Sequence, residues 1–440
     1  MKQKIKIALI CLARTTFDYE AAKEIYKRIQ SELKEIENVE WEIIPNLIIE
    51  IQEAKKIAKI LHSKNVDALV CISGTFALGH LILEINKELK CPILLWGLNE
   101  LPYDGGRIRL NSVCGVNLNA SNLYKGGVKN FHLVFGDKID VDWIDAVRIK
   151  KALFDAHVGI IGYRAKGFFN LDVDELDLYK EVGVLIDHFE LEEIFSYPIN
   201  ENEISYRKKQ IESIFDVNAI NEEQLLKVAR LAGKFDKFMS ENELDAIAIR
   251  CWPEFANKFG ISPCAAMSVL QSEGKILTCE GDILGSLSMI AHKAIGAKTP
   301  FLADFSQIDF KDNFGLLWHC GVAACNLWDG KCNRSLDSAF SGGKGVTADF
   351  VIKPAEEISL ARFDYAPPND YRIYIQKAKG IPMKKELKGT YAKVKFEKNI
   401  EEVIKTLVYN GIAHHISVVL GDYIKPFEIF AKIQGWEIIK

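Results

Sequence analysis

Histidines and carboxylates stand in this chain where they could bind a metal ion together. His414 and His415 are adjacent near the C-terminus, and Glu280 and Asp304 lie far upstream. Imidazole nitrogen and carboxylate oxygen both suit a divalent cation such as Mn²⁺. Adjacent residues of a strand point to opposite faces, so we expect at most one of the two histidines to face a given metal. The sequence predicts a mixed nitrogen and oxygen site if these segments meet in space.

The carboxylate of Glu280 follows the apolar run Ile276–Cys279 and precedes Gly281 and a predicted helix over Leu284–Ile295. A carboxylate at the C-terminal end of a strand, followed by glycine, can project into a cleft with little steric obstruction. It could serve there as a ligand or as a base. The alternative is that Glu280 or Asp282 only caps the helix through its free N–H groups.

Two further polar residues end short apolar runs downstream. Asp304 lies 24 residues after Glu280, about the length of one helix and one strand. Neighbouring parallel strands would bring both acids to one sheet edge, although Asp304 alone is typical of a turn. His319 ends another run, and a ligand role competes there with that of a hydrogen-bonded core histidine.

The elements that must position these residues follow from the pattern of apolar runs. In the first third, short apolar runs alternate with amphipathic stretches, which predicts a parallel sheet with helices on both faces. The expected strands are Ile5–Leu12, Trp41–Ile44, Ala68–Ile72 and Pro92–Trp96, and the expected helices are Tyr19–Ile36, Ile51–Ser63 and a helix that ends near Leu89.

A second α/β block is expected from the strand at His157–Tyr163, through Asp245–Arg250, to Ile276–Cys279. From about Pro300, short β-like runs separated by Gly, Pro and Asp predict a small barrel or sandwich, with helices near the C-terminus. The expected fold is two doubly wound, Rossmann-like α/β domains over residues 1–150 and 151–300, and then a β-rich, barrel-like domain over residues 301–440.

Composition limits the classes of partner. The 440 residues carry a formal net charge of −4, so no basic field favours nucleic acid or an anionic membrane as a partner. No stretch approaches the ~20 apolar residues of a membrane-spanning helix. The N-terminal apolar run ends at Arg14, which favours a first strand over a signal peptide, so we expect a cytoplasmic protein. The ten scattered cysteines are expected to be reduced thiols.

The order of several short motifs resembles the L-fucose isomerase and L-arabinose isomerase family. The likeness extends over the whole chain, which is shorter than either named enzyme, so it indicates the reaction more firmly than the sugar. The motifs are Leu12–Asp18, Val113–Asn117, Cys279–Asp282, Phe301–Phe305, Leu316–Gly321, Gly411–His415 and Gly421–Tyr423.

The resemblance implies an intramolecular oxidoreductase, an aldose–ketose isomerase that acts on an open-chain monosaccharide through a cis-enediol. Its Mn²⁺ site, which Co²⁺ or Mg²⁺ could also fill, would use Glu280, Asp304 and His415, with the two acids as the catalytic pair. His319 matches a further metal-binding histidine of the arabinose isomerases, whereas the fucose isomerases use three protein ligands. At Asp304 the sequence follows the fucose branch, because arabinose isomerases carry Glu at the place of Ala303.

The resemblance also implies a homotrimer or homohexamer in which the N-terminal domain of a neighbouring subunit helps to close the site. Arg14 and Phe17 would then contact the sugar, a fucose- or arabinose-type sugar or a sulfonated hexose. Trp252 and Glu254 follow a predicted strand and could stack on or bond to a sugar, with core packing as the other role for Trp252.

Two rival functions remain open on the sequence alone. Two α/β lobes with a cleft also describe a non-catalytic, cytoplasmic sugar-binding or sensor protein that resembles periplasmic binding proteins. A metal-free racemase or epimerase would instead need Cys71 and another thiol facing one pocket.

Overall fold

The structure, a computed structural model, describes residues 1–440 in full. Its contacts divide the chain into two units. One contains Lys2–Lys151 with Glu428–Trp436, and the other contains Ala152–Phe427 with Glu437–Lys440 and Met1. None of the helices combines the length and the apolar character that crossing a bilayer requires. The separation of residues 151–300 from 301–440 into two domains stays a prediction.

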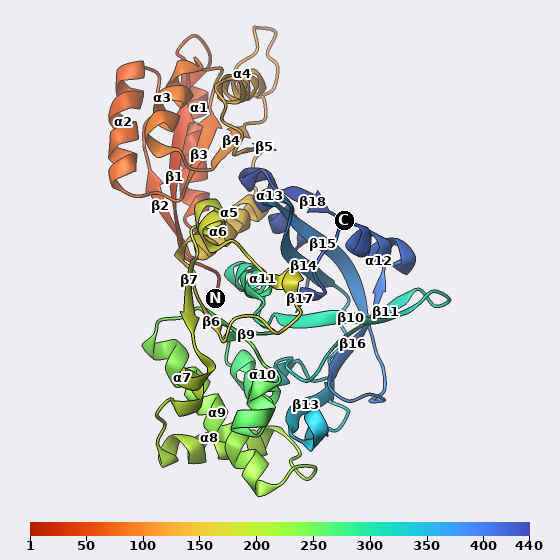
Figure 1. The fold of residues 1–440 in the computed structure, drawn as a ribbon. Coiled ribbons are helices and arrows are strands. Elements are labelled where there is room, and N and C mark those ends of the chain that lie inside the picture. The colour runs from red at the N-terminus through yellow and green to blue at the C-terminus, as the bar shows by residue number, and fades with distance from the viewer. The chain divides into compact units, whose positions relative to one another are not determined.

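The N-terminal unit is built on a five-stranded parallel sheet with the order β2-β1-β3-β4-β5 (Figure 1). Helices α2, α3 and α4 share one hydrophobic core with alternate residues of the central strands. The elements are β1 (Ile5–Leu12), α1 (Tyr19–Leu33), β2 (Val39–Ile43), α2 (Ile51–Ser63), β3 (Ala68–Ser73), α3 (His80–Leu89), β4 (Ile93–Gly97), α4 (Ser112–Lys125), β5 (Phe131–Phe135) and α5 (Val141–Asp155).

Local patterns explain most of these elements. In α2 the buried residues Ala54, Ile57, Ala58 and Leu61 recur at helical spacing and form one apolar face. Strand β1 is almost wholly buried because it lies between β2 and β3, which is why it reads as a continuous apolar run.

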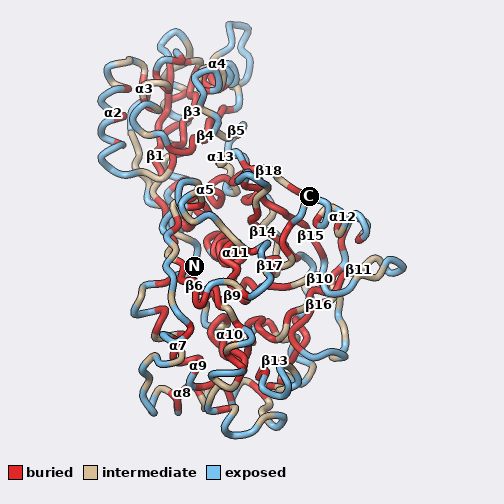
Figure 2. The backbone as a smooth tube through the Cα atoms, viewed as in Figure 1, coloured by how far each residue is buried: buried red, intermediate tan, exposed pale blue.

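The second unit begins with a four-stranded parallel sheet of order β7-β6-β8-β9. Helices α10 and α11 are buried on nearly every side, and their path is red in Figure 2. The elements are β6 (His157–Ile161), α6 (Glu175–Val182), β7 (Leu185–Phe189), α7 (Leu191–Ser196), α8 (Glu201–Ile214), α9 (Glu222–Glu241), β8 (Ala246–Ile249), α10 (Cys264–Ser272), β9 (Ile276–Cys279) and α11 (Ile283–Ala294).

The rest of this unit is a nine-stranded, mainly antiparallel sheet with the order β12-β13-β16-β11-β10-β17-β14-β15-β18. Because β15 also pairs with β16, the strands from β16 through β11, β10, β17 and β14 to β15 close into a ring. The expected fold class, α/β with a barrel-like β-rich part, is confirmed. The elements are β10 (Phe301–Asp309), β11 (Phe314–His319), β12 (Ser335–Phe340), β13 (Gly345–Val351), β14 (Ile358–Ala366), β15 (Asp370–Ile381), β16 (Thr390–Phe396), α12 (Ile400–Tyr409), β17 (His415–Leu420) and β18 (Glu437–Ile439). Helix α13 (Ile424–Gln434) begins in this unit, and its residues from Glu428 onward belong to the N-terminal unit.

Candidate functional site

A sharp turn between β9 and α11 carries the first acid of the site. Glu280 has a φ of 65° and Gly281 a φ of 79°, and a Cβ on Gly281 would lie 2.6 Å from the Cα of Arg164. A left-handed backbone at a residue other than glycine costs roughly 1–3 kcal/mol and is often found at active sites. Asp282 then caps α11, because its Oδ1 accepts a hydrogen bond of 2.8 Å from the N–H of Gly285.

Strand β10 carries the second acid and places it beside a histidine. Asp304 lies directly opposite Trp318 of β11 and His415 of β17. Opposed residues of antiparallel strands share one face of the sheet, so Asp304 and His415 are neighbours. The expectation that the two acids lie on neighbouring parallel strands is wrong. Glu280 follows a strand of the parallel sheet, Asp304 belongs to the antiparallel sheet, and His415 lies within reach of both.

The distances around His415 fit a metal site. Its Nε2 lies 3.6 Å from Glu280 Oε2 and 3.8 Å from Asp304 Oδ1. The possible ligand atoms of Glu280, His414 and His415 lie within 4.8 Å of one another, as do those of Asp304, His319 and His415. Bonds of roughly 2.0–2.3 Å to one ion put its ligand atoms about 3–4 Å apart. Asp304 Oδ1 is also buried without a hydrogen-bond partner. His415 therefore belongs to two groups of possible metal ligands, one with Glu280 and one with Asp304.

A buried carboxylate fixes the orientation of His415. Asp282 Oδ2 lies 2.9 Å from His415 Nδ1 and forms an ion pair with Arg362, and neither of these two charged side chains is exposed to solvent. Burial acts to raise the pKa of Asp282, but Arg362 and His415 outweigh it and hold that pKa far below its usual range. The ionised carboxylate accepts the proton of Nδ1, so the lone pair of Nε2 faces the two acids.

The sequence pattern indicated only a capping role for Asp282, and nothing in it marked Arg362. The capping role is correct, but it is only part of what the carboxylate does. Arg362 lies in the middle of β14, 80 residues after Asp282, and no local motif distinguishes it from a surface arginine. The Cys-Glu-Gly-Asp motif drew attention to Asp282, but no local signal marked its contact with Arg362.

Two side chains hold Glu280 by hydrogen bonds. His414 Nε2 lies 3.1 Å from Glu280 Oε2, and Trp252 Nε1 donates to Glu280 Oε1 over 3.4 Å. Burial acts to raise the pKa of Glu280, but the bond from His414 and the charges of the nearby histidines lower it below its ordinary value. Glu280 is therefore ionised, as a ligand or a base must be.

The residues expected to bind sugar lie in different settings. Trp252 is 42% exposed and packs edge-on against Phe168 at 5.9 Å, so the expectation that Trp252 packs in the core is wrong. Glu254 lies 3.3 Å from the Nε of Arg250. The role of Trp252 and Glu254 in sugar binding stays a prediction.

Arg14 and Phe17 follow β1 in the N-terminal unit. The backbone N–H of Arg14 donates to Thr75 Oγ1 over 2.8 Å, and Phe17 packs against Phe76 at 5.8 Å. Their contribution to a neighbouring subunit's site stays a prediction. Cys71 is fully buried in the core of the same unit, and burial raises the pKa of its thiol, which argues against Cys71 as a base.

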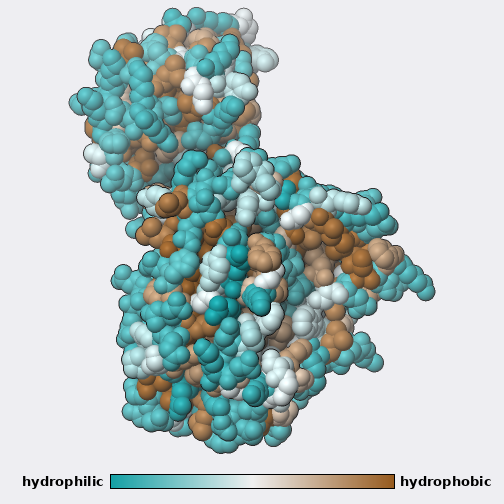
Figure 3. Space-filling view, viewed as in Figure 1, coloured by the Kyte–Doolittle hydropathy of each residue, from teal (hydrophilic) through white to brown (hydrophobic).

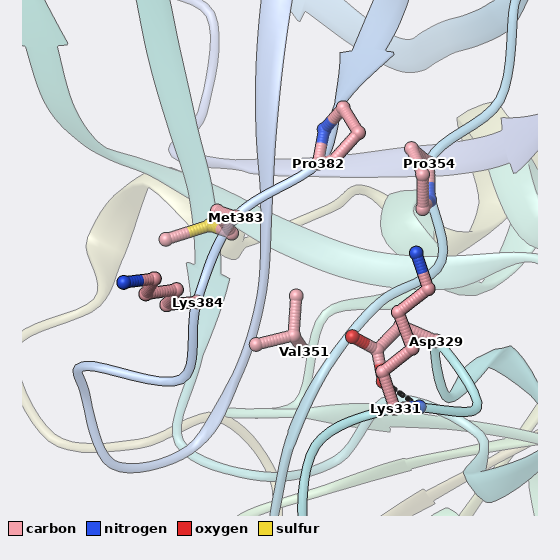
Figure 4. A pocket seen from close by; sticks show the side chains of 7 residues that line it. All are labelled: Asp329, Lys331, Val351, Pro354, Pro382, Met383 and Lys384. Atoms are coloured by element: carbon pink, nitrogen blue, oxygen red, sulfur yellow. Dashed lines mark hydrogen bonds between the residues drawn. The ribbon is translucent and has the colours of Figure 1, made fainter.

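Two hollows open on the β-rich part. One has a volume of about 490 Å³, enough for a monosaccharide, and includes Trp318, the neighbour of His319, and Ser306, two residues beyond Asp304. The other, of about 330 Å³, contains none of the residues discussed above (Figure 4). The second hollow is lined by Asp329, Lys331, Val351, Pro354, Pro382, Met383 and Lys384.

On the face seen in Figure 3, hydrophilic residues cover most of the surface.

Known proteins with similar sequences define the class. Residues 8–138 match the family model "Fucose/sulfoquinovose isomerase, N-terminal domain". The chain is 30% identical to a sulfoquinovose isomerase of Priestia aryabhattai, over 96% of this chain and 95% of that protein. It is 26% identical to a sulfoquinovose isomerase of Alkalicoccus urumqiensis, over 85% of this chain and 86% of that protein. These matches define an enzyme of the aldose–ketose isomerase class.

The chain belongs to the fucose/sulfoquinovose isomerase family. Its alignment covers nearly the whole Priestia protein, so the two chains are similar in length. An ABC transporter periplasmic solute binding protein from Actinobacillus succinogenes 130z, solved with bound D-allose, matches 68% of this chain and 85% of its own at 12% identity, with a TM-score of 0.18. Membership of this isomerase family does not favour the alternative of a non-catalytic sugar-binding or sensor protein.

Proposed function

We propose that this enzyme is a metal-dependent isomerase of sulfoquinovose, with Glu280, Asp304 and His415 as the metal ligands. The observation that carries this proposal is the position of His415. Its Nδ1 is bound by the anionic Asp282, while its Nε2 lies within 4 Å of an oxygen of each acid. Carboxylate, carboxylate and imidazole together suit Mn²⁺, Co²⁺ or Mg²⁺.

A divalent cation held by these residues would supply Lewis acidity, which makes the C2–H of an open-chain aldose easier to ionise. The side chains perform the proton transfers. One acid of the Glu280 and Asp304 pair removes the proton from C2 and returns it to C1 through a cis-enediol. The other moves the hydroxyl proton from O2 to O1, so that the aldose becomes the ketose without loss of atoms.

The surroundings of the two acids differ, which suits this division. Glu280 receives hydrogen bonds on both oxygens, from His414 and from Trp252. Asp304 Oδ1 is buried and receives none. Two carboxylates with unequal hydrogen bonding take different protonation states more readily than two identical ones.

The substrate is proposed from the relatives, which are named sulfoquinovose isomerases. Sulfoquinovose carries a sulfonate, which L-fucose, L-arabinose and D-arabinose lack. Assays with all four sugars test which of them is the substrate. A homotrimer or homohexamer in which Arg14 and Phe17 close a neighbouring site is part of the same proposal. The mass of the protein in solution tests that assembly.

The test uses the metal-stripped protein, the protein reloaded with Mn²⁺, and a panel of these four sugars, with a ketose assay as the readout. We expect ketose only from the loaded enzyme, and most rapidly from sulfoquinovose.

Glu280→Gln should lower kcat by at least about 10³-fold, since it removes a ligand or base. Glu357→Gln, an exposed glutamate paired with Lys377, is the matched control and should retain activity. Full activity of the Glu280→Gln enzyme with added Mn²⁺ would refute the assignment.

A further inference from the structure

The imidazole of His319 is held in a different way from that of His415. The backbone N–H of Cys320 donates to His319 Nδ1 over 2.9 Å. The thiol of the same cysteine lies 3.2 Å from Nδ1. Because this backbone N–H donates to Nδ1, that nitrogen acts as the acceptor and holds the lone pair. The proton of the neutral ring must then be on Nε2.

The Nε2–H of His319 faces the site without a partner. His319 is 4% exposed, and its Nε2 is buried with no hydrogen bond. Its possible ligand atom lies within 4.8 Å of those of Asp304 and His415, and its ring stacks on that of His415 with centroids 5.3 Å apart. A second proton on the ring would enter at Nδ1 and leave Nε2–H as it is. A metal bound at Nε2 would require the ring proton to move to Nδ1, where it would face the backbone N–H of Cys320 at 2.9 Å.

His414 shows the same pattern as His319. The amide Nδ2 of Asn170 lies 3.4 Å from His414 Nδ1, and His414 Nε2 is the atom that approaches Glu280. With a donor amide on Nδ1, the proton is on Nε2 and is donated to the carboxylate. Of the three histidines beside the acids, His415 alone has a carboxylate on Nδ1, and it alone turns a lone pair toward them.

We propose that His319 is a hydrogen-bond donor to an oxygen of the bound sugar and is not a ligand of the metal. A buried donor without a partner is unfavourable, and an oxygen of the substrate would supply the missing acceptor. Such a donor also stabilises negative charge as it develops on that oxygen during proton transfer. The sugar as acceptor rests on the proposed function, whereas the exclusion of His319 as a ligand rests on its hydrogen bonds alone.

The protonated nitrogen can be measured directly by ¹⁵N NMR of histidine-labelled, metal-free protein, with His319→Gln and His415→Gln used to assign the signals. We expect a proton on Nε2 of His319 and none on Nε2 of His415. A His319 with an unprotonated Nε2 would overturn the proposal, whatever reaction the enzyme catalyses.

The second measurement compares Mn²⁺ binding and catalysis in three variants. His319→Leu should keep a Kd for Mn²⁺ within about threefold of the wild type, while kcat/KM falls by about 10²–10³, as for the loss of one donor to a developing anion. His319→Gln, whose amide can replace Nε2–H, should recover part of that loss. His415→Leu should weaken Mn²⁺ binding by at least about 10²-fold.

Equal losses of Mn²⁺ affinity in His319→Leu and His415→Leu would refute the proposal. A wild-type enzyme that isomerises no sugar in the panel would refute the proposed function and with it the sugar as acceptor. In that event the NMR result would still decide whether His319 can be a ligand.

Discussion

His415 and His319 lie stacked beside the same two acids, but their surroundings give them opposite chemistry. A buried carboxylate, Asp282, accepts the Nδ1 proton of His415, whereas a backbone N–H donates to Nδ1 of His319. The first arrangement turns a lone pair toward the acids, and the second turns a proton toward them. The comparison shows that the residue type does not settle whether a histidine is a ligand. What decides it is the group that is hydrogen-bonded to Nδ1, because that group determines whether Nε2 has a lone pair or a proton.

The largest effect is expected on the His415 side of this comparison. Asp282→Asn keeps a good helix cap but removes the negative charge that holds Nδ1–H and pairs with Arg362. We expect Mn²⁺ affinity to fall by about 10–100-fold, and stability to fall by about 3 kcal/mol because Arg362 loses a buried partner. Mn²⁺ titration, with circular dichroism to confirm the fold and a denaturant series for stability, measures both effects.

The matched control for Asp282 is Asp187, which also pairs with a histidine, His157, at 2.8 Å but is 61% exposed. Asp187→Asn should change stability by less than about 1 kcal/mol and leave Mn²⁺ binding unaltered, since water screens that pair. If the two variants bound Mn²⁺ equally well, Asp282 would have no part in orienting His415.

A third buried histidine extends the comparison to a site without a carboxylate. His292 on α11 is fully buried, its Nδ1 lies 2.9 Å from Ser417 Oγ, and burial lowers its pKa from 6.5 to about 3. Its folded pKa lies below its unfolded one, so the unfolded chain binds more protons between these values. The contribution of neutral His292 to the free energy of unfolding is therefore present in full above about pH 6.5. It decreases as the pH is lowered, by about 1 kcal/mol between pH 6.5 and 5.5.

Urea unfolding at a series of pH values measures this slope. His292→Asn keeps a polar atom near the position of Nδ1 and should unfold with a smaller pH dependence than the wild type. An unchanged slope in the variant would assign the acid sensitivity to other groups.

The smallest effect is expected at Trp252, which donates a hydrogen bond to Glu280 at the exposed edge of the site. Trp252→Phe removes the 3.4 Å hydrogen bond to Glu280 but keeps an aromatic ring against Phe168. One such bond is worth about 0.5–1.5 kcal/mol, so kcat/KM should fall by about threefold. Steady-state kinetics on sulfoquinovose measure this change. A loss as large as that of His319→Leu would show that the indole does more than hold Glu280.

Much of the fold could be read from local patterns. The bounds of Ile5–Leu12, Ile51–Ser63 and Ile276–Cys279 agree with the structure, because each is a short apolar or amphipathic run with clear ends. Helix α4 was not predicted, since its sequence contains Gly115 and three asparagines, which are poor helix formers, and its pattern is weakly amphipathic. Strand β5 was missed as well.

The sequence by itself determined which side chains could do chemistry. Glu280, Asp304, His319 and the adjacent pair His414 and His415 were all named from residue types, spacing and resemblance, and the structure brings them together. Their roles in catalysis and metal binding remain the proposals made above.

Tertiary structure alone decided how each histidine is oriented and which nitrogen carries its proton. The contacts of Asp282 with Arg362 and with His415 join positions 80 and 133 residues apart. No local pattern can specify such contacts, because they form only when the antiparallel sheet closes against the buried helix α11. The residue types follow from the sequence, but the protonated nitrogen of each ring depends on the neighbours that folding supplies.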